Sequence, residues 1–250
     1  MRTIDLNADL GEGYDDAAVM PHISSANIAC GFHAGDAATM RRTVALCIEH
    51  DVAIGAHPSL HDPQNFGRRE MDVAPGEVYA QMLYQIGALA AFARAAGTKL
   101  HHVKPHGALY NMSARDRALA DAIACAVHDF DPSLILVGLA GSASIEAADN
   151  AGLRAAQEAF CDRRYRADGS LAPRSQANAV IENIDDAIAQ AVSIATRNEA
   201  IAEKDTRVRI EADTLCVHGD RADAGEFARR LREALEHAGL RVAALEHSNA

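Results

Sequence analysis

Short apolar runs alternate along the chain with stretches whose apolar residues recur at helical spacing. The apolar runs predict strands buried on both faces at residues 3–6, 26–30, 52–56, 100–103, 134–139, 154–156 and 214–217. Helical periods lie between them, at residues 40–48, 78–93, 119–127 and 227–235. Pro75 precedes the second of these helices, and Ser113 is the expected N-cap of the third. A weaker run at residues 240–245 is either an eighth strand or a packed tail.

The alternation of strands and helices predicts βαβ units around a parallel sheet. An open doubly wound sheet also fits this alternation, but no GxGxxG fingerprint follows the first strand. No linker or low-complexity segment divides the chain. We therefore expect an α/β fold with residues 1–250 in one domain, a distorted TIM-like (β/α) barrel of about seven parallel strands.

Reactive side chains follow almost every predicted strand. They are Asn7, Asp9 and Glu12 after the first, His33 after the second, His57 after the third, Lys104 and His106 after the fourth, Glu158 and Asp162 after the sixth, and His218 and Asp220 after the seventh. Because all strands of a parallel barrel end on one face, we expect these side chains to converge there. Asp36 and Asp220 are equally well explained as helix N-caps, and Cys30 and Cys216 as small buried hydrophobes.

Two types of site chemistry are suggested by these residues. Asp9, His33 and His57 offer oxygen and nitrogen ligands for a divalent metal, although no fixed-spacing motif such as HExxH is present. Lys104 stands beside His106 and can neutralise a carboxylate, polarise a carbonyl group or act as a base. A salt bridge to a neighbouring strand-end acid is the structural alternative for this lysine.

Two long connections carry arginines to the same face. Residues 58–74 include Arg68 and Arg69, and residues 160–176 include Arg163 and Arg174. Long connections of this kind are often lids or binding loops. Since arginine binds carboxylates and phosphates in a bidentate manner, we expect one of the four to hold an anionic group.

Composition narrows the function classes. The net charge of −11 argues against a nucleic-acid partner, and 4% aromatic residues with no Trp leave little for stacking against sugars or bases. Neither a secretory signal nor a membrane span is visible in the sequence. The five scattered cysteines form neither a disulfide framework nor a CxxC motif. A cytoplasmic location is the expectation.

The strand ends and their flanks form six blocks between residues 5 and 220, which are DLNADLGEG, NIACGFHAGD, GAHPSLHDPQNFGRR, VKPHGALYN, EAFCDRRYRADGSLAPRS and CVHGD. In combination and order, these blocks resemble the LamB/YcsF family. The resemblance implies a barrel similar to the glycoside hydrolase/deacetylase superfamily. It also implies ATP-dependent cleavage of 5-oxo-L-proline to L-glutamate, carried out with 5-oxoprolinase subunits B and C. The sequence contains no GxxxxGK[ST] loop, so ATP is expected to be bound mainly by the partners or at a shared interface.

The resemblance and the strand-end pattern together give candidate roles. The candidate catalytic residues are Asp9, Glu12, Lys104, His106, Glu158, His218 and Asp220, and the candidate substrate-binding residues are Asn7, His33, His57, Arg68, Arg69, Asp162, Arg163 and Arg174. Asp9 or Glu158 is the hypothetical base for water, and His106 or His218 the acid for the ring nitrogen. Lys104 would stabilise an oxyanion or a phosphate. The alternatives are an autonomous metal-dependent deacetylase or hydrolase of a small amide or sugar, and a non-catalytic subunit that binds a small acid.

Overall fold

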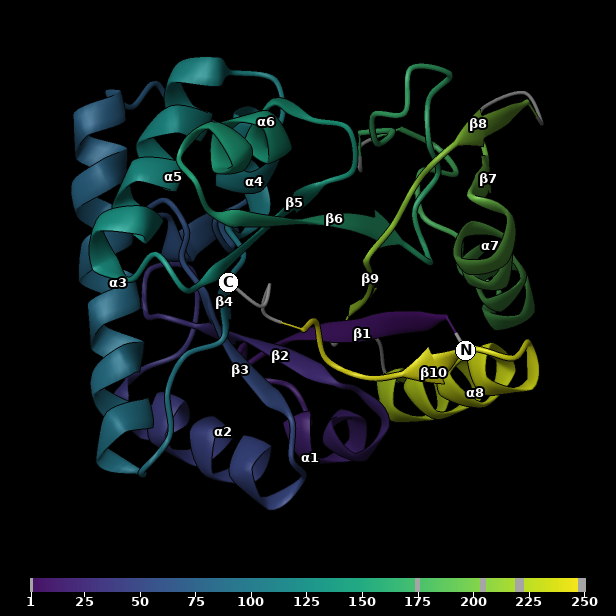
Figure 1. Cartoon of the computed structure of the whole chain (residues 1–250), viewed down its shortest axis with the longest axis horizontal. Helices are drawn as coiled ribbons and strands as arrows, with labels where there is room; N and C mark the ends of the chain where they lie inside the picture. The colour runs from purple at the N-terminus through teal and green to yellow at the C-terminus, as the bar shows by residue number, and fades with distance from the viewer. Residues whose placement is uncertain (1, 174–175, 203–205, 219–222, 247–250) are drawn as a thin grey trace.

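Seven parallel strands close into a barrel (Figure 1). The structure is a computed structural model that describes residues 2–173, 176–202, 206–218 and 223–246. The barrel strands are β1 (Thr3–Leu10), β2 (Ser25–Ala29), β3 (Ala53–His57), β4 (His102–Val103), β5 (Ile135–Leu139), β6 (Arg154–Phe160) and β9 (Thr214–His218). Their order is sequential, and β9 pairs with both β6 and β1, which closes the barrel. All seven predicted strands and the predicted barrel are confirmed.

The helices surround this barrel on its outside. They are α1 (Asp16–Val19), α2 (Ala37–Glu49), α3 (Pro75–Ala95), α4 (Gly107–Ser113), α5 (Arg117–Phe130), α6 (Ala143–Asn150), α7 (Ile184–Arg197) and α8 (Ala224–His237), with 3-10 turns at Met20–His22 and Pro63–Asn65. Asp36 caps α2 by accepting a hydrogen bond from the Thr39 amide at 2.7 Å. The expected cap at Ser113 is wrong, because Ser113 is the last residue of α4 and the Asp116 carboxylate caps α5.

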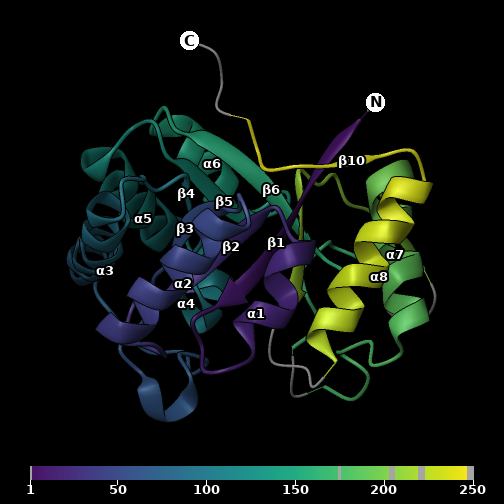
Figure 2. The same cartoon turned by 90° about the horizontal axis from the view of Figure 1, so that it is seen from below.

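The chain leaves the β/α alternation between β6 and β9. There α7 packs against α8, side by side with it in Figure 2, and an antiparallel pair forms from β7 (Glu199–Ile201) and β8 (Arg207–Arg209). At the end of the chain, β10 (Arg241–Val242) pairs in parallel with the first residues of β1. The weak run at residues 240–245 is therefore partly a strand, and Leu245 beyond it packs against Ile135 and Val137.

Strand alternation separates two kinds of buried residue. The large apolar core lies between the strands and the helices, and on β1 it takes Ile4, Leu6, Ala8 and Leu10. The intervening residues of β1 are Asp5, Asn7 and Asp9, which are also buried and face the barrel interior. Much of this barrel interior is therefore polar. In this it differs from ordinary β/α barrels, whose interiors hold bulky branched side chains. This polar interior supports the site at the carboxyl ends of the strands.

None of the helices among the described residues has the length and apolar character needed to cross a membrane. All five cysteines are free thiols, and four of them are buried, Cys30 and Cys216 included.

Candidate functional site

A buried network of amide groups orients the acidic end of β1. The Asn27 side chain donates hydrogen bonds to the Asp9 carboxylate at 2.9 Å and to the side-chain oxygen of Asn7, Oδ1, at 2.7 Å. Its own oxygen accepts a hydrogen bond from His102 Nε2 at 2.8 Å. The His102 ring occupies the space that a side chain on Gly55 would fill, since a Cβ there would lie 2.1 Å from Nε2. This fixed packing determines which way the Asn27 amide faces, and thereby holds Asp9.

Lys104 forms the second part of the site. Its ammonium group lies 2.9 Å from Asp9 Oδ1 and 2.7 Å from Glu158 Oε1, and it is 3.2 Å from Cys216 Sγ. Burial alone would lower the pKa of Lys104, but Asp9, Cys216 and Glu158 together raise that pKa well above its ordinary value. Lys104 is therefore a buried, permanently charged ammonium held between two carboxylates.

A cluster of three histidines and a carboxylate lies beside this ion network. Glu12, His33, His57 and His106 each offer one ligand atom, and these four atoms lie within 4.8 Å of one another. The His33 and His106 rings stack with their centroids 3.8 Å apart. The connection after β3 packs tightly on them, because a Cβ on Gly67 would approach His33 Cβ to 2.8 Å. The rings are thus held in place from several sides.

The hydrogen bonds made on the outer side of this cluster fix the histidine tautomers. His57 Nδ1 lies 2.7 Å from the Lys104 carbonyl oxygen, and His106 Nε2 lies 2.8 Å from the Phe66 carbonyl oxygen. Because a carbonyl oxygen only accepts, both of these nitrogens carry the proton. In neutral rings the inner nitrogens, His57 Nε2 and His106 Nδ1, then have lone pairs that face each other at 3.0 Å. A proton or a metal ion has to lie between them.

The charges around the cluster favour a cation. His57 Nε2 is 3.3 Å from Asp9 Oδ2, and His33 Nε2 is 2.9 Å from Glu12 Oε1. Burial lowers the pKa of His57, but the Asp9 carboxylate outweighs it and the pKa is raised, so the cluster can hold one proton there. Burial and the neighbouring His57 lower the pKa of His33 to about 2, so its ring stays neutral.

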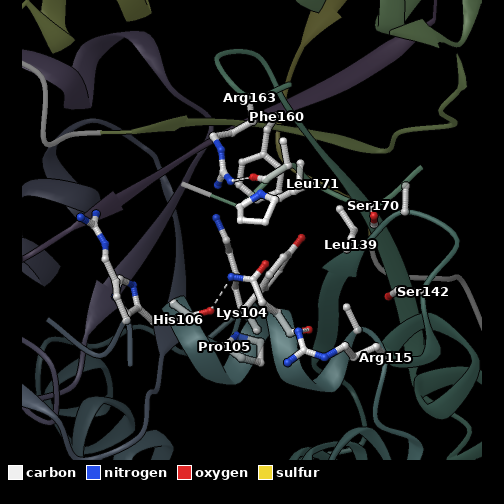
Figure 3. Close-up of a pocket in the computed structure, with 18 of the residues that line it drawn as sticks. Lys104, Pro105, His106, Arg115, Leu139, Ser142, Phe160, Arg163, Ser170 and Leu171 are labelled. Carbon is white, nitrogen blue, oxygen red and sulfur yellow. Dashed lines mark hydrogen bonds between the residues drawn. The ribbon is translucent and has the colours of Figure 1, made fainter. Parts of the chain in front are cut away.

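A cavity of about 790 Å³ opens over both groups. Figure 3 shows Lys104 facing this cavity with Leu139, Phe160 and Leu171 around it. Lys104 Nζ lies 5.6 Å from the centre of the Phe160 ring. The volume falls in the range of small-molecule sites, and the walls combine a charged side with an apolar side.

The structure brings most of the expected site residues together. Asp9, Glu12, His57, Lys104, His106, Arg68 and Arg163 line the cavity, while Asn7, His33 and Glu158 support it from behind. Arg163 is buried and donates to the Ala172 carbonyl oxygen at 2.6 Å. Arg69 is not part of the cavity lining; its side chain is 63% exposed and pairs with Asp62.

The remaining candidates give less information. Asp162 is buried just after β6. Burial is the main reason why the pKa of Cys216 is raised, and the nearby Asp162 charge adds a small part. Arg174 and Asp220 lie outside the described residues. The backbone of His218 pairs with Asp9, but its side chain lies outside the described part of the chain.

Sequence reasoning missed Asn27, His102 and Tyr110. Asn27 and His102 lie inside predicted strands, and the period of two places each on the face that the barrel encloses. A polar residue at such a position was a signal that could have been used. Tyr110 belongs to helix α4, which the apolar pattern did not reveal, and so its approach to the cavity was not predictable.

The sequence profile of the LamB/YcsF family matches residues 4–250. The chain belongs to the LamB/YcsF family. Among its relatives, the 5-oxoprolinase A subunit of Shouchella clausii is 55% identical, over 98% of this chain and 99% of that protein.

Solved structures agree with this membership. The crystal structure of a lactam utilization protein from Thermus thermophilus superposes with a TM-score of 0.92 at 48% identity, covering 97% of this chain and 100% of that one. The polysaccharide deacetylase Bc1974 from Bacillus cereus reaches a TM-score of 0.52 at 11% identity, over 100% of this chain and 95% of that one. At this low identity the likeness concerns the fold alone, and it confirms the expected similarity of the barrel to those of deacetylases.

Proposed function

We propose that this chain acts as the A subunit of an ATP-dependent 5-oxoprolinase, which opens the lactam ring of 5-oxo-L-proline to give L-glutamate. The observation that carries the proposal is the buried Lys104, held between Asp9 and Glu158 at the floor of a cavity of small-molecule size. Likeness over nearly the full length to 5-oxoprolinase A subunits supports it. Subunits B and C are the proposed partners, and the cytoplasm is the proposed compartment.

The chemistry explains why ATP is required. A lactam is a resonance-stabilised amide whose nitrogen leaves poorly, so hydrolysis near neutral pH needs activation. Phosphorylation of the amide oxygen would make the carbon a better electrophile. The sequence contains no phosphate-binding GxxxxGK[ST] loop, and we assign the activation step to subunits B and C. This chain would then deliver water and protonate the nitrogen.

Asp9 is the better placed of the two candidate bases. Glu158 is completely buried, while Asp9 lines the cavity. Lys104 and Asn27 hold Asp9 Oδ1, and Oδ2 is turned towards His57. Lys104 itself supplies a fixed positive charge for an oxyanion or a phosphate, and a charge that is already in place needs no reorganisation during the reaction.

The histidine cluster fits a divalent metal. Its donor set is three imidazole nitrogens and one carboxylate oxygen, which suits Zn²⁺ and related ions. The outer hydrogen bonds from His57 and His106 to carbonyl oxygens are the second-shell contacts that metal-binding histidines ordinarily make. Glu12, His33, His57 and His106 would hold the ion. This set keeps His33 and His57 of the three ligands expected from the sequence, adds Glu12 and His106, and leaves Asp9 beside the cluster, 3.3 Å from His57 Nε2. Such an ion would polarise a substrate oxygen or lower the pKa of a bound water.

The decisive experiment measures ATP-dependent glutamate release from 5-oxoproline. It compares the purified chain alone with the chain plus subunits B and C, each with and without a chelator. Activity only in the complete mixture supports the proposal. If folded subunits in every combination release no glutamate, the proposal is wrong.

An autonomous metal-dependent hydrolase is the second candidate, favoured specifically by the histidine cluster. It predicts hydrolysis of a small amide or acetylated sugar by the chain alone, without ATP and inhibited by chelator. A non-catalytic subunit that only binds the acid would instead retain 5-oxoproline binding, while substitution of Lys104 or Asp9 left turnover by the complex unchanged.

A further inference from the structure

Two buried polar groups meet beside the cavity. Burial raises the pKa of Tyr110 well above its ordinary value, and the neighbouring Glu158 raises it further through its charge and through a hydrogen bond with the phenol. Neither the Tyr110 hydroxyl nor Glu158 Oε2 has another hydrogen-bond partner among the described residues. The phenol is therefore protonated, and its oxygen keeps lone pairs for a ligand in the cavity, which Tyr110 lines.

The rest of the Glu158 carboxylate is already committed. Its Oε1 atom accepts from Lys104 Nζ at 2.7 Å and from Asn7 Nδ2 at 3.0 Å. These two contacts fix the carboxylate and leave Oε2 as the acceptor on the Tyr110 side. A donor, Lys104, therefore stands next to an acceptor and a hydroxyl group along one edge of the site.

Apolar groups form the opposite side of the same space. The Tyr110 and Phe160 rings meet edge to face, with centroids 5.8 Å apart, and they cluster with Leu139 and the partly buried Leu171. Figure 3 shows Leu139, Phe160 and Leu171 together on one side of Lys104. The site thus has a hydrogen-bonding edge and an apolar wall.

This combination matches a small cyclic amide. The ring forces the amide to be cis, so that its carbonyl oxygen and its N–H lie on the same edge, while its methylene groups lie on the other. Lys104 places its positive charge beside the carbonyl oxygen, and the Tyr110 hydroxyl can reach the ring nitrogen, since both residues line the cavity. The methylene groups then pack on Phe160 and Leu139.

We propose that Tyr110 is a further catalytic residue, the proton donor to the lactam nitrogen, in a site where Lys104 faces the amide edge and Glu158 positions Tyr110 from behind. This inference rests on the proposed 5-oxoprolinase function and adds a residue that sequence reasoning did not single out. The group that protonates the nitrogen has to carry a proton at neutral pH and has to reach the cavity. Tyr110 lines the cavity and is protonated there.

His106 meets these requirements less well. Its Nε2 proton is committed to the Phe66 carbonyl oxygen, and its Nδ1 points to His57 and Glu12.

The proton transfers balance on the O-phosphorylated lactam that subunits B and C are proposed to supply. Water adds to the activated carbon and gives a proton to Asp9, while the C=N electron pair moves to nitrogen, which takes the Tyr110 proton. The C–N bond then breaks with its electron pair on nitrogen, which takes the proton of Asp9, and the new hydroxyl group returns a proton to Tyr110 as the acyl phosphate forms. A second water molecule releases phosphate and leaves glutamate.

The test is Tyr110→Phe, which removes one oxygen atom and keeps the ring. In the complex with subunits B and C, kcat for glutamate release is expected to fall by about 10²–10⁴-fold, the range typical of a lost general acid, with KM little changed. Tyr79→Phe is the matched control, because its hydroxyl bonds Asp129 on the outer helices. This control should keep wild-type kcat.

The outcomes separate the two proposals. A wild-type complex that releases no glutamate refutes the 5-oxoprolinase function, and this inference fails with it. If the wild-type complex is active and Tyr110→Phe keeps its kcat, or changes only KM, the donor role is wrong and the 5-oxoprolinase function still stands.

A second variant covers the case in which Tyr110→Phe does not fold. Replacing Tyr110 by a fluorinated tyrosine keeps its shape and makes the phenol more acidic. The alkaline limb of the kcat–pH profile should then move to lower pH. An unmoved limb contradicts the proposal.

Discussion

Two charged groups share one cavity, but their hydrogen bonding is of opposite kinds. Around Lys104, donor meets acceptor, since the ammonium donates to Asp9, Glu158 and the side-chain oxygen of Asn7. Around His57, acceptor meets acceptor, since two imidazole lone pairs and two carboxylates converge. The Lys104 ammonium finds all its partners within the polypeptide, whereas the lone pairs around His57 are satisfied only by a proton or a cation.

This difference indicates a division of tasks. A permanently charged lysine is suited to stabilising negative charge on the substrate, because its own charge does not depend on added ions. An electron-rich cluster with rigid rings is suited to binding a cation. Four predictions test this contrast, from the largest expected effect to the smallest.

Replacing Lys104 by Met should damage both folding and activity. It leaves Asp9 and the fully buried Glu158 without their counter-charge, which typically costs about 3–5 kcal/mol of stability. Activity of the complex should fall by at least about 10²-fold, through loss of the electrostatic stabiliser. Urea unfolding and glutamate release are the measurements. Lys99→Met, at an exposed lysine, is the control, and equal stability of the two variants would show that Lys104 does not balance these acids.

Filling the histidine cluster should stabilise the protein. A divalent ion at 100 times its Kd adds about 2.7 kcal/mol to the free energy of unfolding, so Zn²⁺ should raise the thermal midpoint of chelator-treated protein. His106→Gln should weaken metal binding by at least about tenfold, while His128→Gln, at an exposed histidine far along α5, should not. If Zn²⁺ raised the thermal midpoint of both variants equally, the ion would have to bind outside the histidine cluster.

The sequence predicted the barrel well because the strands are apolar on both faces in a regular alternation with helices. It also predicted that Asp9, Lys104 and Glu158 would lie on one face, since every strand of a parallel barrel ends there. It did not predict α4, which is a short helix of seven residues without a clear apolar period. Tyr110 could not be placed for that reason.

Hydrogen-bond pairing is the other feature that the sequence does not contain. The lone-pair conflict at His57 depends on which carbonyl oxygens lie behind the rings, and those belong to Lys104 and Phe66, distant in sequence. The N-cap of α5 shows the same limit on a smaller scale. Ser113 and Asp116 are both good capping residues, and only the end of α4 at Ser113 decides between them.

Loosening the amide network should weaken the Lys104 group without removing a charge. Gly55→Ala would place a Cβ 2.1 Å from His102 Nε2, which displaces the ring and frees the Asn27 amide that orients Asp9. Overpacking of this kind costs about 1–3 kcal/mol. Gly76→Ala, where a Cβ meets nothing within 4 Å at the start of α3, is the control and should be neutral or stabilising. The free energy of unfolding in urea and kcat should both fall for Gly55→Ala and for that variant only. A wild-type kcat in Gly55→Ala would mean that Asn27 does not position Asp9.

The smallest effect is expected at Cys216, the sulfur contact of Lys104. Its Sγ accepts from Nζ at 3.2 Å, and burial raises the pKa of its thiol well above the ordinary value. A protonated, enclosed thiol is a weak acceptor and not a nucleophile. Cys216→Ala should therefore cost only about 1 kcal/mol of stability, the net value of one hydrogen bond. Since Asp9 and Glu158 still bracket the ammonium, kcat should stay within about threefold of wild type, less than about 0.7 kcal/mol in the barrier. A loss as large as that of Lys104→Met would show that sulfur, and not the two carboxylates, governs the lysine.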